Sequence, residues 1–290
     1  MNAKFRALIQ ITRPINLLII LLTQLLFMAK GAEWLQAGVG SLLHLNMDLL
    51  RIQEALFLML ATLSAAAAGN VVNDIEGQAA DLVNKPGRRH VGTAVRVKTA
   101  WVFYLVLLVG SLGAAWMVDL AFFIFTVVIN LLLFFYSSDL KGMPLAGNIL
   151  VAMLTAAVVF VSRKGIEDAS MLPFSEFTVM AFLLNLSREL VKDVEDEEGD
   201  RAAGIGTFVV CYGSKKALQL SAMLLFLAFG AALALAVFHP GGWMFRLHLI
   251  LASLAILLQA VTLLCSQTAG PSSRNIKLLM LFGLLAVLWA

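Results

Sequence analysis

Charged residues and cysteines are both scarce in this sequence. Only 13% of its 290 residues are charged, whereas a soluble globular domain carries about 25%. Hydrophobic residues make up 61% of the chain, and the mean hydropathy is +0.91. The net charge of +3 is too small to indicate a nucleic-acid partner, and the two cysteines, Cys211 and Cys265, are too few for a disulfide framework. These shortages exclude a soluble enzyme and a disordered chain, and they predict a protein that crosses a membrane several times.

Nine apolar segments are long enough to cross a bilayer, which takes roughly 20 mostly apolar residues. They are residues 15–32, 53–72, 99–118, 120–137, 144–162, 173–191, 216–238, 244–266 and 275–290. His239-Pro240-Gly241-Gly242 separates the seventh segment from the eighth, and Gly270-Pro271-Ser272-Ser273 separates the eighth from the ninth. We therefore expect an all-α polytopic membrane protein, a bundle of nine transmembrane helices around a central cavity. Residues 1–290 are expected to form a single domain.

The basic residues are distributed unevenly over the two sides of this topology. With the N-terminus inside, 16 of the 21 Lys and Arg residues fall inside and 5 fall outside. Because Lys and Arg accumulate on the cytoplasmic side of membrane proteins, the N-terminus and the two long polar segments, 73–98 and 192–215, are expected in the cytoplasm. The membrane is expected to be the cell (inner) membrane.

The acidic residues gather on the same side. Eleven of the 18 Asp and Glu residues fall inside, and ten of these eleven lie at the end of the second or the sixth predicted span. The two ends are four helices apart, so they emerge on the same face of the membrane. We infer one active cavity built from two acidic helix ends.

Helical spacing arranges each acidic motif into a stripe. In the first motif, Asn73, Gly77 and Asp81 are four residues apart and would share a face if the helix continues. The second motif has Glu189, Asp193, Asp196 and Asp200 at spacings of four, three and four. Carboxylates in a row repel one another unless a cation neutralises them, and carboxylate oxygens are ligands that Mg²⁺ prefers, commonly together with substrate phosphates. Basic side chains next to both motifs suit phosphate oxygens: Lys85, Arg88, Arg89, Arg188 and Lys192.

These residues resemble the UbiA superfamily of intramembrane prenyltransferases. That family has nine spans and two Asp-rich motifs, matched here by Asn73-Asp74 with Asp81 and by Asp196 with Asp200. Asn84-Lys85-Pro86 follows the first motif at the offset that the family shows. A further family run after the fourth span is matched by Tyr136-Ser137, Leu140-Lys141, Pro144 and Gly147-Asn148.

The second motif carries the resemblance to a subgroup. Its core, Lys192 to Arg201, looks most like digeranylgeranylglyceryl phosphate synthases, which attach a geranylgeranyl chain to a glycerol phosphate ether lipid. The core is also similar to homogentisate prenyltransferases and chlorophyll synthases, so an aromatic acceptor is the main alternative. Gly77 departs from the family, which has an aspartate at this position. Glu76 would compensate only if the helix is unwound there.

The resemblance implies a Mg²⁺-dependent transfer of a polyprenyl group, geranylgeranyl in this subgroup, from its diphosphate to a lipid acceptor. It implies Mg²⁺ ligation by Asn73, Asp74, Asp81, Asp196 and Asp200, and it makes Asp81, Asp193, Asp196 and Asp200 the catalytic residues. Asn70, Lys85, Arg88 and Lys141 are the implied contacts of the prenyl diphosphate. The expected partners are this donor, a lipid or aromatic acceptor and the membrane lipids, with no nucleic acid.

Two other functions are compatible with parts of the sequence. A transporter would need ionisable groups near the middle of its spans, and the predicted spans lack charges at their centres. A non-catalytic relative that binds prenyl lipids would account for Gly77.

Overall fold

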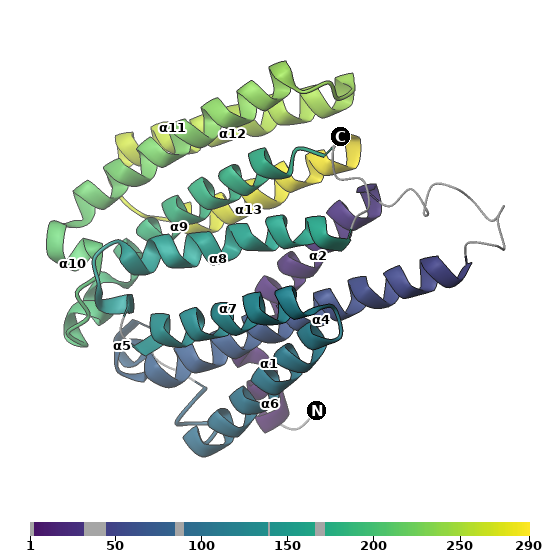
Figure 1. The fold of residues 1–290 in the computed structure, drawn as a ribbon. Helices are drawn as coiled ribbons and strands as arrows, with labels where there is room; N and C mark the ends of the chain where they lie inside the picture. Colours follow the sequence, from purple (N-terminus) through teal and green to yellow (C-terminus); the bar gives the residue numbers. More distant parts are fainter. Residues whose placement is uncertain (1–2, 32–44, 85–89, 139, 166–171) are drawn as a thin grey trace. The chain divides into compact units, whose positions relative to one another are not determined.

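The chain folds into helices. The computed structural model describes residues 3–31, 45–84, 90–138, 140–165 and 172–290, and within these ranges every regular element is a helix (Figure 1). A single bridge joins Val91 and Val95 without forming a strand. The expected all-α class is confirmed. The elements are α1 (Ala3–Ile11), α2 (Pro14–Gly31), α4 (Leu45–Glu76), α5 (Gln78–Asn84), α6 (Val97–Trp116), α7 (Leu120–Ser138), η1 (Leu140–Gly142), α8 (Ala146–Ser162), η2 (Arg163–Gly165), α9 (Phe174–Ala202), α10 (Phe208–Tyr212), α11 (Ser214–Phe238), α12 (Trp243–Ser266), α13 (Ser272–Leu284) and η3 (Leu285–Trp289).

The expected count of nine spans is not confirmed. In the described part of the chain, six helical segments are long and apolar enough to cross a membrane: α4, α6, α7, α11, α12, and α13 together with η3. α1 and α2 pass the same test only as a pair, bent by 50°, which would make seven. α8 is apolar but shorter, and the second half of α9 carries the second acidic motif. The chain is an integral membrane protein whose number of crossings remains a prediction.

The polar segment 192–215 is mostly helical, as the spacing of its acidic residues predicts. α9 continues through the second acidic motif to Ala202, and α10 follows from Phe208 to Tyr212, so most of the region 192–215 is helix. Pairs of opposite charge four residues apart support this extension, namely Lys192 with Asp196 and Glu197 with Arg201. Hydropathy predicts only the apolar part of a helix that continues beyond the membrane.

The described helices divide into two compact units, and each is considered by itself. Unit 1 comprises the described parts of residues 1–22 and 33–140, and unit 2 those of residues 23–32 and 141–290. The unit boundaries fall at three places along the chain; one lies within α2, one within η1, and the third, after residue 32, is outside the described residues. The expectation of a single domain stays a prediction.

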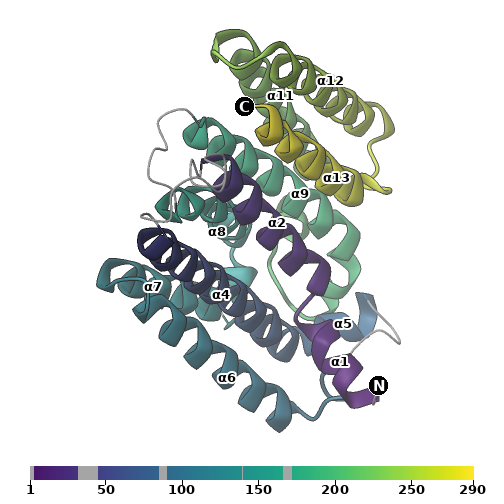
Figure 2. The same ribbon diagram turned by 90° about the vertical axis from the view of Figure 1, so that its right-hand side faces the viewer.

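In unit 1, α4 packs against α6 and α7 (Figures 1 and 2). The packing is close at Gly69, where an added Cβ would lie 2.8 Å from a methyl carbon of Leu133. Small residues allow such close approach between membrane helices. Buried polar side chains add links, because Ser111 Oγ donates to the carbonyl of Ala61 (3.1 Å) and Asn130 Nδ2 donates to Ser111 Oγ (3.3 Å). The end of α4, which carries the first acidic motif, is thereby set in a packed helical layer.

In unit 2, α9 packs against α8 and α11, and α11 packs against α12. The view in Figure 2 shows α11 and α12 side by side, with α13 next to α12. Phe27, from the second half of α2, stacks on Phe174 with ring centroids 4.8 Å apart. Ser187 and Ser221, both fully buried, share a hydrogen bond of 2.7 Å between α9 and α11. These contacts fix the rotation of α9 and therefore the direction of its acidic face.

Candidate active site

The first acidic motif lies at the end of α4, in unit 1. α4 ends at Glu76, Gly77 forms a turn, and α5 begins at Gln78. Hydrogen bonds of helical spacing continue here: the amide of Gly77 donates to the carbonyl of Asn73 (2.8 Å), and the amide of Asp81 donates to the carbonyl of Gly77 (3.0 Å). Asn73, Gly77 and Asp81 therefore stay on one face. Glu76 is exposed and lies about 100° away around the helix, so it does not share the face of Asn73 and Asp81.

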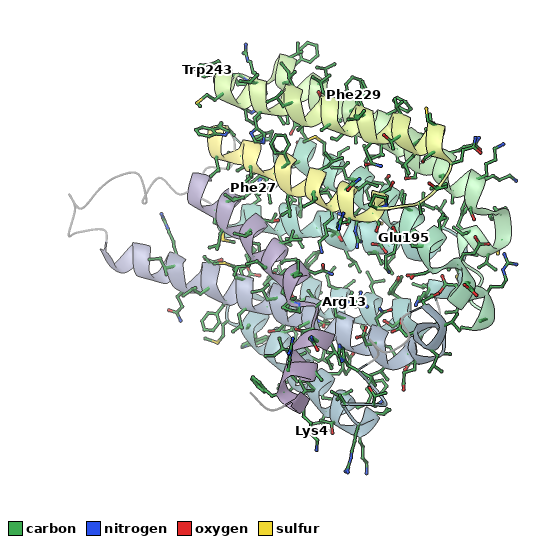
Figure 3. All side chains as sticks on the ribbon, turned by 180° about the vertical axis from the view of Figure 1, so that it is seen from behind. Lys4, Arg13, Phe27, Glu195, Phe229 and Trp243 are labelled. Carbon is green, nitrogen blue, oxygen red and sulfur yellow. The ribbon has the colours of Figure 1, made fainter. Side chains whose placement is uncertain are left out.

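Two contacts hold the turn between α1 and α2 against this motif. Arg13 Nη2 donates to Asp74 Oδ1 at 2.9 Å, and Asn70 Nδ2 donates to the carbonyl of Thr12 at 2.9 Å. Arg13 has a φ of 55°, and Pro14 opens α2, so the chain turns sharply at this point (Figure 3). Asn70 and Asp74 thus have partners within unit 1 that orient the beginning of the motif.

Two predicted diphosphate contacts follow the first motif. Lys85 and Arg88 belong to the segment 85–89, which lies outside the described residues. α5 ends at Asn84, directly before this segment. The role of both cations stays a prediction.

The second acidic motif lies on α9, in unit 2. Because α9 is continuous from Phe174 to Ala202, Glu189, Asp193, Asp196 and Asp200 share one helical face. Glu189 is 7% exposed and Asp200 is 3% exposed, and the other two are half-buried. Partly buried carboxylates in a row are costly unless positive charge or hydrogen-bond donors compensate them.

Two cations on α9 supply part of this compensation. Arg188 forms an ion pair with Glu189. Lys192 Nζ lies 4.0 Å from Glu189 Oε2 and 3.8 Å from Asp196 Oδ2, between the two carboxylates. These distances are long and the side chains are partly exposed, so the Lys192 pairs add little stability.

Asp193 receives a hydrogen bond from another helix. Asn148, in the first turn of α8, donates from Nδ2 to Asp193 Oδ2 at 2.8 Å. Asp193 lies beyond the apolar part of α9, and burial raises its pKa to about 7. The hydrogen bond from Asn148 and the charge of Lys192 oppose this rise, whereas the charges of Glu189 and Asp200 add to it. A positive charge placed at this face would favour the ionised carboxylate.

Lys141 lies in unit 2, in the short helix η1 before α8. The carbonyl of Gly142 is so close to Gly206 that an added Cβ at position 206 would lie 3.1 Å from it. The amide of Ile205 donates to the carbonyl of Asp200 at 2.8 Å, which fixes the turn after the second motif. The segment that carries Lys141 therefore lies against the turn that follows Asp200.

Two other acidic residues of α9 have structural partners. Glu197 accepts hydrogen bonds from the hydroxyl of Ser214 and from Arg201, and these donors lower its pKa. Glu195 accepts a hydrogen bond of 2.8 Å from the hydroxyl of Ser273, in the first turn of α13 (Figure 3). A carboxylate at a helix N-terminus interacts favourably with the helix dipole. Glu195 and Glu197 thus join α9 to its neighbours.

The donor set fits Mg²⁺. In the part of the chain that the structure describes, no three His, Cys, Asp or Glu side chains converge into a closed metal cage. Mg²⁺ is usually held by one or two carboxylates with substrate phosphates and water, so it needs no such cage. The oxygen ligands available are Asn73, Asp74 and Asp81 in unit 1 and Asp196 and Asp200 in unit 2.

Sequence reasoning does not find the partners of these carboxylates. Asn148 and Arg13 contact the two motifs, yet the sequence assigns a site role to neither. The available signals are Gly147-Asn148, which follows Lys141 in the matched run, and Arg13-Pro14, which precedes the first span. Both are short, and their meaning depends on which helices pack together.

Comparisons with known proteins identify the family. The model of the UbiA prenyltransferase family matches residues 34–285. A digeranylgeranylglyceryl phosphate synthase of Methanopyrus kandleri is 34% identical over 231 residues, which are 77% of this chain and 82% of the relative.

Two solved structures have the same fold. One, of a digeranylgeranylglyceryl phosphate synthase in membranes, has a TM-score of 0.74 and 22% identity, covering 99% of this chain and 98% of the other. The second is a UbiA homolog from Archaeoglobus fulgidus bound to GPP and Mg²⁺, with a TM-score of 0.59 and 18% identity. The match covers 97% of this chain and 99% of the homolog.

Proposed function

Because the chain belongs to the UbiA prenyltransferase family and is therefore a prenyltransferase, we propose that it transfers a geranylgeranyl group from geranylgeranyl diphosphate to geranylgeranylglyceryl phosphate. The observation that carries the proposal is the face of α9, where four partly buried carboxylates stand with Arg188 and Lys192 beside them. A soluble acidic surface would leave such carboxylates exposed. This face is built to bind a cation together with an anionic substrate.

The chain's own residues bind and orient the donor. The allylic C–O bond breaks as diphosphate leaves, so negative charge grows on the leaving group and must be met by positive charge. Mg²⁺, when bound, supplies that charge. Asp196 and Asp200, with Asn73, Asp74 and Asp81 of the first motif, are its proposed ligands.

Cationic and amide side chains complete the proposed diphosphate contacts. Lys141, on the segment that lies against the turn after Asp200, binds phosphate oxygens, and Lys85, Arg88 and Asn70 do so from the first motif. The apolar helices exclude water from the allylic cation, which water would otherwise consume. That both motifs serve one diphosphate is an inference from their order along the sequence.

The acceptor is proposed from the named relative and from the second motif. The synthase of Methanopyrus kandleri supports a glyceryl phosphate lipid acceptor. The core of the second motif, from Lys192 to Arg201, also resembles digeranylgeranylglyceryl phosphate synthases. Prenylation of an aromatic acceptor is an outcome that the test below distinguishes.

The orientation in the membrane is part of the proposal. The excess of basic residues on one side supports a cytoplasmic N-terminus and cytoplasmic segments 73–98 and 192–215 in the cell membrane. A diphosphate made in the cytoplasm would then reach both motifs without crossing the bilayer.

The test uses the full chain purified in detergent with Mg²⁺ and labelled geranylgeranyl diphosphate. Geranylgeranylglyceryl phosphate and homogentisate are offered together, and the product masses are read. We expect the doubly prenylated glyceryl phosphate. Asp196→Asn should abolish transfer, whereas Glu198→Gln, an exposed neighbour on α9, should retain it. A prenylated aromatic product would contradict the proposed acceptor, and no product with either acceptor would contradict prenyl transfer.

A further inference from the structure

Asn148 is a buried amide on a helix that is otherwise almost entirely apolar. It is 9% exposed, in the first turn of α8, whose other residues are almost all apolar. A buried amide without a hydrogen-bond partner costs free energy. Asn148 has a specific partner on another helix, because its Nδ2 donates to Asp193 Oδ2 at 2.8 Å. This is a donor aimed at a carboxylate of the second acidic motif.

The backbone is strained where α8 begins. Leu145 has a positive φ, with φ 68° and ψ −32°, and its carbonyl accepts from the amide of Ile149 at 2.9 Å. A positive φ is unfavourable for a leucine. This strained residue lies between the segment of Lys141 and Asn148, at the start of α8.

The charged groups around Asp193 do not hold it by themselves. Lys192 is the neighbouring cation, but its nearest carboxylate oxygens are those of Asp196 and Glu189, at 3.8 and 4.0 Å. Glu189 and Asp200 repel the ionised Asp193 from the same face of α9. The amide of Asn148 is therefore the donor that fixes the orientation of this carboxylate.

We propose that Asn148 is a positioning residue of the prenyl-transfer reaction. It holds the Asp193 carboxylate toward the acidic face of α9, and it ties the helix that follows Lys141 to the second motif. The inference rests on the proposed function, because Asp193 is placed in the site by that proposal. Removing a residue that orients a metal-site or active-site carboxylate typically lowers activity or metal affinity by about 10–100-fold.

A double-mutant cycle tests this role. Turnover of geranylgeranyl diphosphate is measured for the full chain and for Asn148→Ala, Asp193→Ala and the double variant. Asn148→Ala should lower kcat/KM for the donor by about 10–100-fold. If Asn148 acts through Asp193, it has little further effect once Asp193 is alanine. Multiplicative losses would overturn the proposal.

Further variants separate the donor from the space that the side chain fills. Asn148→Asp keeps the size but removes the donor, so it should be at least as harmful as Asn148→Ala; a milder effect would contradict positioning. Asn130→Ala removes a buried amide of unit 1, which donates to the carbonyl of Thr126 at 2.9 Å. This control should lower the unfolding temperature while kcat/KM is retained.

A readout besides turnover is the rise in unfolding temperature on adding MgCl₂ with geranylgeranyl diphosphate. Asn148→Ala should show a smaller rise than the original chain, and Asn130→Ala an equal one. An unchanged rise in Asn148→Ala would overturn the proposal. If the original chain transfers no prenyl group, the proposed function fails and this inference fails with it. If it does and the cycle is multiplicative, only this inference fails.

Discussion

Replacing Gly77 with aspartate would place a carboxylate on the face that already carries Asn73 and Asp81. The backbone accepts the change, because Gly77 is not among the residues with positive φ and its hydrogen bonds have helical spacing. We expect Gly77→Asp to raise the affinity for Mg²⁺ in the presence of the prenyl diphosphate.

The size of the effect follows from one added oxygen ligand. Mg²⁺ takes few protein ligands, so we expect affinity to rise by about tenfold, which is about 1.4 kcal/mol. The backbone contributes little, because glycine and aspartate differ by only a few tenths of a kcal/mol in helix propensity. The gain should therefore appear in Mg²⁺ binding rather than in the stability of the metal-free chain.

The assay is a MgCl₂ titration of the unfolding temperature with geranylgeranyl diphosphate present. Ala79→Asp is the matched control, because position 79 is exposed and receives the same charge on a different face of the helix. An equal rise in Mg²⁺ affinity in both variants would mean that the added negative charge attracts Mg²⁺ at a distance and that the carboxylate introduced at position 77 is not a ligand. If Gly77→Asp weakens Mg²⁺ binding and Glu76→Gln abolishes turnover, Glu76 is the ligand and the argument from helical register is wrong.

Three further predictions concern the second acidic motif and its side of the membrane. Lys192→Met removes the cation beside Asp196, so without Mg²⁺ the unfolding temperature should fall by at most about 2–4 °C. Adding Mg²⁺ should then raise the unfolding temperature of this variant more than that of the original chain. An equal rise in both would contradict the role of Lys192 as a cation at this face. The lowered pKa of Glu197 adds stability above its unfolded-state pKa of 4.5, which is lost as the pH falls below that value. Glu197→Gln should therefore lose less stability than the original chain between about pH 6 and pH 3, and an equal loss would contradict the role of Glu197. An impermeant thiol reagent outside intact cells should not label Cys211 in a Cys265→Ser variant, whereas labelling would reverse the proposed orientation.

Hydropathy was sufficient to predict the fold class and most helix positions. Apolar runs and turn residues are local features, so the break between α11 and α12 at residues 239–242 could be predicted directly. Hydropathy does not predict the end of α9, because residues 192–202 are polar; the spacing of the acidic residues predicts it instead, and charge pairs support it. Apolar content also does not decide whether short or charged helices such as α8 and α9 cross the bilayer.

The acidic motifs could be predicted, but their supports could not. The spacing of carboxylates along one helix is visible in a sequence, and α9 is continuous where that spacing requires it. The bond from Asn148 to Asp193 spans 45 residues, and that from Arg13 to Asp74 spans 61. Such contacts depend on which helices become neighbours and how each is rotated, and a single sequence does not contain that information in readable form.

Mg²⁺-dependent donor binding tests the central claim most directly. The affinity of the purified chain for geranylgeranyl diphosphate is measured by calorimetry with MgCl₂ and again with a chelator. The carboxylates and the diphosphate repel each other without the metal, so we predict that binding is lost on chelation and that Asp200→Asn weakens it even at saturating Mg²⁺. An affinity that is unchanged by the chelator would contradict the assignment of the acidic helix ends as a magnesium–diphosphate site.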